Sequence, residues 1–303
     1  PLYHAAGLVT WLQGVLLAGA TCVMQSGWDA AHFAELAEHH RMSAVMLVPV
    51  QLREFLDLPG LDAERLANLK KISCAGAASS VELIADLHKA LPGISFFDHY
   101  GSSETGLICM LKPGDPSDKW GTIGRPVAGV DLQLIGPDGK PAGPGEVGEL
   151  VVGGPFMMAG YFNDSEETAA YFRSGDRRGW TGDLATRDSD GFITLVGRSK
   201  DMIVSGAVNI YPREVELVLE SHPFVRECTV FGIPDEKWGE TLVAYVVRET
   251  DETLDADLLT AFCTEHLARF KRPRIIRFVD EIPKTPSGKI QKPKLREAFL
   301  NRQ

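Results

Sequence analysis

Paired cysteines are missing from the sequence. Its five cysteines stand alone, and none has the C-x-x-C spacing that is typical of a redox or metal-binding motif. We therefore expect reduced thiols, as in a cytoplasmic protein, rather than a disulfide framework. The first residues also lack a signal-peptide pattern, which agrees with that expectation.

Basic charge is scarce for a protein that binds nucleic acid. The 303 residues include 31 Lys and Arg against 41 Asp and Glu, which gives a net charge of −10. This balance argues against nucleic acid or an anionic membrane as the main partner. The stretch from Lys271 to Gln303 is the exception, because it holds 10 basic and 3 acidic residues and could face phosphates.

Long apolar runs are scarce as well. The uncharged stretch from Leu8 to Met24 is interrupted by Gln13, Gly14 and Gly19, and it is short for a membrane span. We therefore expect no transmembrane segment. With 44% hydrophobic and 24% charged residues, the composition fits a globular chain of about two domains and excludes a disordered or collagen-like one.

The first third of the sequence alternates helical and strand patterns. Helices are predicted over 8–18, 30–41, 51–56 and 81–91. Strands are predicted over 21–24, 44–48, 71–75 and 95–98. Such alternation predicts a parallel, doubly wound α/β sheet, and we assign residues 1–112 to this α/β subdomain.

From about residue 113 the pattern changes twice. Frequent glycine and proline between short apolar runs predict a β-rich, barrel-like subdomain over 113–198. Its predicted strands cover 130–135, 149–152 and 192–196. A compact α+β domain is predicted over 199–303, with helices over 212–221, 255–267 and 292–299 and strands over 229–232, 242–248 and 274–279.

The most informative run is His99-Tyr100-Gly101-Ser102-Ser103-Glu104-Thr105-Gly106, directly after a predicted strand. Ligands bind at the carboxyl ends of such strands. By residue type, Tyr100 could stack on a base, the hydroxyls could bind phosphate, and Glu104 could hold Mg²⁺ through oxygen. A plain polar turn explains this run equally well when it is taken alone.

Four further motifs follow in order: Gly182-Asp183, Gly197-Arg198, the run 205–212 and the run 283–290. Asp183 and Arg198 offer an acid and a base suited to ribose hydroxyls. Together with the run around Glu104, these motifs resemble those of the adenylate-forming superfamily, which includes acyl-CoA synthetases, luciferases and the adenylation domains of peptide synthetases. The resemblance covers essentially the whole chain.

The resemblance implies a fold and a reaction. The fold would be part of the large adenylate-forming domain, with a parallel α/β sheet and a small barrel-like subdomain, followed by a mobile C-terminal α+β domain. The reaction would be ATP-dependent activation of a carboxylic acid to acyl-AMP, followed by transfer to the thiol of coenzyme A. ATP, Mg²⁺, coenzyme A and a fatty or aryl acid are then the implied ligands.

The resemblance also implies roles in nucleotide binding. The run Gly76-Ala77-Ala78 would lie on the adenine side, where small residues let a base approach the backbone. Tyr100 would stack on the adenine. Asp183 and Arg198 would hold the ribose.

Phosphate chemistry and domain movement would depend on four further residues. Ser103 would contact the α-phosphate, and Glu104 would coordinate Mg²⁺. Lys289 corresponds to the mobile catalytic lysine of the superfamily, and its ammonium would stabilise the charge that develops during adenylation. Lys200 lies at the position of the hinge between the large and small domains.

The acid and the thiol would contact other residues. His4 corresponds to an aromatic gate beside the acyl pocket, and Ala5 and Gly101 would line that pocket. The usual Ser-Gly-Gly of the coenzyme A tunnel is Ser205-Gly206-Ala207 in this sequence. The extra methyl group of Ala207 is expected to narrow the tunnel.

One departure from the superfamily pattern leaves alternatives open. The Gly/Ser/Thr-rich phosphate loop has no counterpart in the sequence, which begins with Pro rather than Met. We therefore expect a C-terminal portion that is inactive by itself, whether as a silent fragment, a homodimer or one half of a split enzyme. An adenylation domain that loads a carrier-protein thiol is the other enzymatic alternative. However, Ala6 stands where those domains keep an Asp for the substrate amine.

Overall fold

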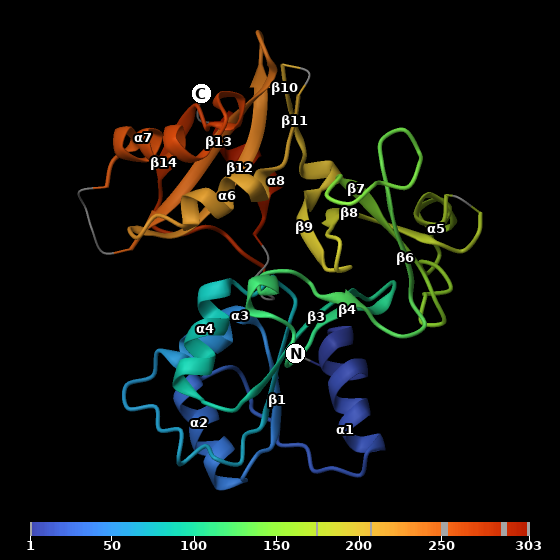
Figure 1. The fold of residues 1–303 in the computed structure, drawn as a ribbon, viewed down its shortest axis with the longest axis vertical. Coiled ribbons are helices and arrows are strands. Elements are labelled where there is room, and N and C mark those ends of the chain that lie inside the picture. Colours follow the sequence, from blue (N-terminus) through green and yellow to red (C-terminus); the bar gives the residue numbers. More distant parts are fainter. Residues whose placement is uncertain (1, 174, 207, 250–253, 286–289, 302–303) are drawn as a thin grey trace. The chain divides into compact units, whose positions relative to one another are not determined.

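The protein was analysed as a computed structural model that describes residues 2–173, 175–206, 208–249, 254–285 and 290–301 (Figure 1). The chain divides into two compact units. Unit 1 comprises Pro1–Thr181 and Thr186–Leu195, and unit 2 comprises Gly182–Ala185 and Val196–Gln303. The division passes through two strands, β8 (Gly179–Arg187) and β9 (Ile193–Arg198).

A five-stranded sheet organises the first part of unit 1. Its order is β1 (Ala44–Leu47), β2 (Lys71–Ala75), β3 (Ser95–Ser102), β4 (Gly106–Leu111) and β5 (Arg125–Pro126). The first three strands pair in parallel, whereas β4 and β5 are antiparallel to their neighbours. The predicted parallel sheet is confirmed for β1 to β3, and two antiparallel strands that the sequence did not predict extend it.

Three helices share a buried core with this sheet: α2 (Ala30–His39), α3 (Pro49–Leu56) and α4 (Val81–Ala90) (Figure 1). The side chains of Asp29 and Ser80 accept backbone hydrogen bonds at the first turns of α2 and α4, which fixes where these helices begin. The core side chains come from helices and strands alike: Phe33, Leu52, Phe55, Ile72, Ile84, Leu87 and Phe96. All three predicted helices are confirmed.

The N-terminal helix is largely exposed. It begins as a π-helix, η1 (Ala6–Gln13), and continues as α1 (Gly14–Leu17), and neither segment has a buried residue. The predicted helix is confirmed, but the strand predicted over 21–24 is wrong, because no strand of the described chain pairs with these residues. No helix in the described part of the chain is both long and apolar enough to cross a membrane.

A second sheet of unit 1 has the order β6-β7-β8-β9, in which β6 (Asp131–Ile135) and β7 (Gly148–Gly153) form an antiparallel pair. Its last two strands are the ones that the unit division crosses. The three strands predicted in this region are confirmed, and β8 was not predicted. The helix α5 (Ser165–Tyr171) lies in the connection between β7 and β8, whereas the short 3₁₀ helix η2 (Ser117–Lys119) lies between β4 and β5 of the first sheet.

Unit 2 contains a third sheet. Its strands are β10 (Ile203–Ser205), β11 (Val208–Ile210), β12 (Val225–Asp235), β13 (Gly239–Arg248) and β14 (Ile275–Phe278). The main order is β11-β10-β13-β12, with β14 paired in parallel to β13. The strands predicted over 229–232, 242–248 and 274–279 are confirmed, with β12 longer than expected.

Two apolar clusters bury both faces of this sheet. One cluster joins α6 (Pro212–Glu220) and α7 (Ala256–His266) to the sheet, and the other joins α8 (Lys292–Leu300). Alternate residues of β13 enter the two clusters, with Ala244 in the first and Tyr245 in the second. Burial on both faces explains why this strand is a nearly continuous apolar run. The three predicted helices are confirmed.

The cysteines are dispersed over both units. All five are free thiols, and Cys74, Cys109, Cys228 and Cys263 are buried, whereas Cys22 is half-buried. Burial raises the pKa of all four buried thiols, that of Cys109 to about 12. These thiols therefore stay protonated at neutral pH and pack as small apolar side chains.

Candidate nucleotide-binding site

The parallel strands of unit 1 end at one edge of the sheet. The register pairs Ala75 at the end of β2 with His99 in β3. Gly76, which leaves β2, and Tyr100, which continues in β3, therefore follow from neighbouring positions. The run Gly76-Ala77-Ala78 is exposed at this edge, and Gly76 has a φ of +91°, which favours glycine. The structure thus brings the predicted adenine-side run and Tyr100 to one sheet edge.

A buried carboxylate ties this run to β3. Asp98 is 6% exposed, and its Oδ2 accepts a hydrogen bond of 3.3 Å from the backbone N–H of Ser79. Burial raises the pKa of Asp98 to about 6, although hydrogen bonds from Ser79 oppose the shift. Because Ser79 follows Ala78, the hydrogen bond limits how far the adenine-side run can move away from the sheet.

The strand predicted over 95–98 continues to Ser102, so the residues from Tyr100 to Gly106 belong to a β-hairpin with β4 and do not lie wholly beyond the strand, as the sequence predicted. Tyr100 pairs with Cys109 and Gly101 with Leu107, and the register shifts between these two pairs. A Cβ atom on Gly101 would lie 2.1 Å from the carbonyl oxygen of Gly106. Only glycine fits there, so the close approach of two backbones explains this residue whether or not Gly101 also lines an acyl pocket.

The hairpin turn presents the predicted phosphate and metal residues. The Ser102 N–H donates to Thr105 Oγ1 at 3.1 Å, and the Glu104 N–H donates to Ser102 Oγ at 3.2 Å. Thr105 is buried beneath the turn, Ser103 is exposed, and Glu104 is half-buried. Side-chain hydrogen bonds within the turn thus set the backbone that carries Ser103 and Glu104.

A tyrosine from a distant segment holds the Glu104 carboxylate. Tyr161 Oη donates to Glu104 Oε1 at 3.0 Å, and the Met158 N–H donates to the Glu104 carbonyl at 2.7 Å. Burial and the hydrogen bond to Glu104 raise the pKa of Tyr161 to about 12, so the phenol remains a donor. Sequence reasoning missed Tyr161, because the contact spans 57 residues and has no local signal.

Glu104 fits a Mg²⁺ ligand by donor type. Mg²⁺ prefers oxygen and is commonly held by one or two carboxylates together with substrate phosphates. The described residues contain no cluster of three or more His, Cys, Asp or Glu side chains that could hold a metal ion by themselves. Mg²⁺ at Glu104 would therefore complete its coordination with phosphate oxygens and water.

Unit 2 contains the predicted ribose pair. Arg198 Nε in β9 lies 2.8 Å from Asp183 Oδ1 in β8, and Asp183 is 8% exposed. Gly182, with a φ of +73°, precedes Asp183. The structure therefore brings together two residues that lie 15 positions apart in the sequence, and the ion pair sets the direction of both side chains.

Three further predicted residues lie in or just before short helical segments. His4 is exposed and Ala5 is half-buried, just before η1. Lys200 is exposed in the short 3₁₀ helix η3 (Ser199–Asp201).

Of the two residues predicted to shape the coenzyme A tunnel, Gly206 and Ala207, the structure describes Gly206. Gly206 has a φ of +59°, and a Cβ atom there would lie 2.9 Å from Trp238 Cε3, so a larger residue would be strained and crowded. Ala207 and Lys289 lie outside the described residues.

Comparison with known families places the chain. Residues 1–162 match the AMP-binding enzyme family, and residues 214–289 match the AMP-binding enzyme C-terminal domain. The chain therefore belongs to the AMP-binding enzyme family.

Curated relatives agree. The chain is 36% identical over 298 residues to an indoleacetate–CoA ligase of Aromatoleum aromaticum. This alignment covers 98% of the chain and 58% of the relative. The chain is also 36% identical over 310 residues to a medium/long-chain-fatty-acid–CoA ligase of Mycobacterium tuberculosis, with 99% and 53% covered. The chain thus spans little more than half the length of these relatives.

A solved structure confirms the predicted fold class. The ATP-bound crystal structure of MatB from Rhodopseudomonas palustris superposes with a TM-score of 0.92 at 29% identity. The match covers 99% of this chain and 59% of that protein.

Proposed function

We propose that this chain carries the C-terminal part of an ATP-dependent carboxylate–CoA ligase. The observation that supports this most directly is the sheet edge of unit 1, where Gly76-Ala77-Ala78 and Tyr100 lie side by side next to the turn that carries Glu104. An aromatic ring, small residues and a carboxylate are what an adenine with Mg²⁺-bound phosphates requires.

The adenosine would bind between backbone and ring. The exposed run Gly76-Ala77-Ala78 lets the base approach the backbone, and Tyr100 supplies a face for stacking. Asp183, held by Arg198 at 2.8 Å, would accept hydrogen bonds from the ribose hydroxyls. This part of the site recognises the nucleotide and takes no part in bond making.

The phosphate end would carry the chemistry. Ser103 would donate to the α-phosphate from the exposed turn, and Glu104, oriented by Tyr161, would supply an oxygen to Mg²⁺. When bound, Mg²⁺ supplies positive charge that offsets the charge of the phosphates. Tyr161 keeps the Glu104 carboxylate in one orientation, which limits the reorganisation needed on binding.

The first half-reaction would form an acyl-adenylate. A carboxylate oxygen of the acid attacks the α-phosphorus of ATP, and the bond to the β-phosphate oxygen breaks to release pyrophosphate. Two negatively charged groups must meet in this step, so the Lys289 ammonium would stabilise the transition state. In the second half-reaction the thiolate of coenzyme A attacks the acyl carbon, and AMP leaves.

We propose a fatty or aryl acid as the substrate. The two relatives described above act on an aryl and on a fatty acid. The small residues Ala5 and Gly101 would leave room for either, with His4 as the gate. The thiol of coenzyme A would enter past Gly206 and Ala207, and Lys200 would be the hinge for the movement between half-reactions.

The chain alone should bind ATP weakly. Its sequence carries no glycine-rich phosphate loop, so the β- and γ-phosphates would lack a cradle of backbone N–H groups. Acyl-AMP formation by the isolated 303-residue chain at the rate of a complete ligase would contradict this expectation.

The experiment that tests the proposal uses the longest natural polypeptide that contains this chain. Lys289→Ala should slow adenylation by about 10²–10³-fold, the scale of losing one preorganised electrostatic donor. Thioester formation from a supplied acyl-adenylate should be unchanged. Lys294→Ala, which removes an exposed lysine of α8, is the matched control and should change neither rate.

Two results would contradict the proposal. One is the absence of carboxylate-dependent pyrophosphate release in the wild-type protein for every fatty and aryl acid offered. The other is an equal loss of both half-reactions in folded Lys289→Ala, which would remove the step-specific role of this lysine.

A further inference from the structure

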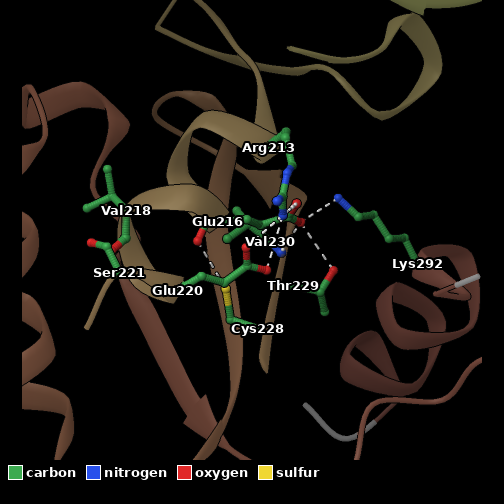
Figure 2. Close-up of polar contacts among 9 residues, drawn as sticks. All are labelled: Arg213, Glu216, Val218, Glu220, Ser221, Cys228, Thr229, Val230 and Lys292. Atoms are coloured by element: carbon green, nitrogen blue, oxygen red, sulfur yellow. Dashed lines mark hydrogen bonds and ion pairs between the residues drawn. The ribbon is translucent and has the colours of Figure 1, made fainter. Parts of the chain in front are cut away.

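A buried glutamate joins three elements of unit 2 (Figure 2). Glu216 on α6 is 6% exposed, and its Oε1 accepts from the Val230 N–H in β12 at 2.9 Å. The same oxygen lies 2.7 Å from Lys292 Nζ, and Figure 2 shows Lys292 reaching toward it from α8. One carboxylate thus connects α6, β12 and the first residue of α8.

Two more charges complete what we call the Glu216 cluster: Arg213, Glu216, Glu220 and Lys292. Arg213 Nη1 lies 2.9 Å from Glu220 Oε2 and 3.9 Å from Glu216 Oε2. Two acids therefore face two bases. Only Glu216 is buried, and the other three residues are half-buried. The nearby cations spare the Glu216 carboxylate the large cost of an unpaired buried ion.

The cluster lies next to the run that carries Lys289, because Lys292 follows Lys289 by three positions. On the other side of that run, Lys284 Nζ lies 2.7 Å from Glu227 Oε1 in β12. Lys284 also pairs with Ile290 in an antiparallel bridge, and the Gln291 N–H donates to the Pro283 carbonyl at 3.1 Å. The residues on both sides of 285–289 are thus held together and fixed to α6 and β12.

A buried ion cluster is poor evidence of a gain in stability, since apolar residues of similar volume often serve as well. The cluster differs from an apolar contact because its ion pair requires a defined geometry of the two side chains. Glu216 Oε1 pairs with Lys292 and also accepts the hydrogen bond from Val230, so the two contacts fix where Lys292 of α8 meets α6. An apolar contact at this place would tolerate sliding. The cluster therefore specifies where α8 begins, and with it the position of the residues that directly follow 285–289.

We infer that Glu216 is a positioning residue for adenylation, acting through Lys292 on the placement of Lys289. The inference rests on the catalytic role that the proposed function gives Lys289. Lys292 follows Lys289 by only three positions, so the inference is that loss of its contact with Glu216 misplaces Lys289. A misplacement of about 1 Å can cost about 10²-fold in rate. Glu216 itself touches neither substrate nor reacting atoms in this role.

The test compares Lys292→Met, which removes the charge, with Lys292→Arg, which keeps it, in the longest natural polypeptide that contains the chain. The control is Arg296→Met, which breaks a half-exposed ion pair to Glu240 one turn later on α8. If Lys292→Met does not fold, Glu216→Gln replaces it, because the amide oxygen still accepts from Val230. Amide exchange at Gln291 and the two half-reactions are measured on each.

We expect faster exchange of the Gln291 amide in Lys292→Met, with adenylation slowed by about 10²-fold at unchanged KM for ATP. Thioester formation from a supplied acyl-adenylate should be unaffected. Lys292→Arg should keep near wild-type values, and Arg296→Met should match the wild type. This pattern of rescue and step specificity would not follow from a loss of stability alone.

Each contrary outcome has one meaning. Unchanged exchange at Gln291 in Lys292→Met overturns the positioning role, even if the wild-type protein does not adenylate. Faster exchange with unchanged adenylation also overturns it, provided that Lys289→Ala is impaired. If Lys289→Ala adenylates normally, the proposed function of that lysine fails instead. Equal losses in both half-reactions reduce the cluster to a structural role.

Discussion

The hairpin of unit 1 and the Glu216 cluster of unit 2 fix their residues by different physical means. In the hairpin, two backbones approach so closely at Gly101 that no side chain fits, and hydroxyls of Ser102 and Thr105 set the turn. In the cluster, the buried carboxylate of Glu216 on α6 pairs with the half-buried Lys292 of α8 and so fixes one helix against another. The first device is short-range, and the second depends on tertiary structure.

This difference distinguishes residues that can bind a ligand from residues that position other parts of the protein. Ser103 is exposed and Glu104 is half-buried, so both can meet a ligand that arrives from solvent. Glu216 already has a half-buried cation and a backbone donor as partners, so its carboxylate is occupied within the protein. Polar residues of the AMP-binding family that look alike in a sequence can thus be sorted by whether the fold leaves them accessible.

The largest expected effect breaks the cluster. Glu216→Ala leaves Lys292 and the Val230 N–H without their carboxylate, and we expect a loss of about 3–5 kcal/mol in the free energy of unfolding. The control on the same helix is Glu214→Ala, which removes a half-exposed ion pair to Lys271 and should cost less than about 1 kcal/mol. Urea unfolding measures both. Equal losses would show that burial of the charge is irrelevant.

The next effect concerns the buried acid of the hairpin strand. The pKa of Asp98 is raised to about 6, so the folded state binds this proton more tightly than the unfolded state does. Its contribution to stability should therefore fall as pH rises from about 4 to 6, by up to about 3 kcal/mol.

Asp98→Asn keeps an oxygen acceptor for Ser79 and removes this titration. Unfolding free energies of both proteins at pH 4 and pH 7 measure the difference between them. An identical pH dependence for wild type and variant would contradict the assignment to Asp98.

A smaller effect is expected at Gly101. In Gly101→Ala the new methyl group meets the Gly106 carbonyl, and the strands must separate at a cost of about 1–3 kcal/mol. Amide exchange of Leu107 should increase in parallel. The matched control is Gly14→Ala in α1, where an added Cβ atom meets nothing within 4 Å. This substitution should leave the free energy of unfolding unchanged or raise it. Normal exchange at Leu107 in Gly101→Ala would exclude the steric explanation.

The smallest effect is expected at Tyr161. Tyr161→Phe removes one hydrogen bond to Glu104, worth about 1 kcal/mol or roughly a fivefold change in affinity. Calorimetry of the longest natural polypeptide should show weaker binding of ATP with Mg²⁺ and little change without it. Tyr3→Phe, at an exposed hydroxyl, is the control. An equal loss with and without Mg²⁺ would place Tyr161 outside the metal site.

Local patterns predicted much of the fold. The strand 71–75 and the start of the helix at Val81 match the structure, in which the Ser80 side chain caps that helix by accepting from the Leu83 N–H. The strand predicted over 21–24 failed, because a strand needs a partner and apolar sequence alone does not provide one. β4 was not predicted, because the strand over 95–98 was expected to end before the run around Glu104, whereas β3 continues to Ser102 and pairs with β4 after a short turn.

Prediction of the site had a similar limit. The rule that ligands bind at the carboxyl ends of parallel strands marked the run around Tyr100, and the family resemblance added Gly76-Ala77-Ala78. The register, which pairs Ala75 with His99, makes these two runs neighbours. Contacts such as Tyr161 with Glu104, 57 residues apart, and Lys292 with Glu216, 76 apart, leave no trace in local sequence. They arise from tertiary packing, which no spacing rule encodes.

The dispersed cysteines give the chain a built-in chemical probe of local opening. An alkylating reagent needs access and a thiolate, and the native fold denies both to the four buried thiols while Cys22 is half-buried. Cys74 and Cys109 belong to unit 1, and Cys228 and Cys263 to unit 2. The order in which these pairs become alkylated under mild denaturant will therefore report which unit opens first, without any engineered label.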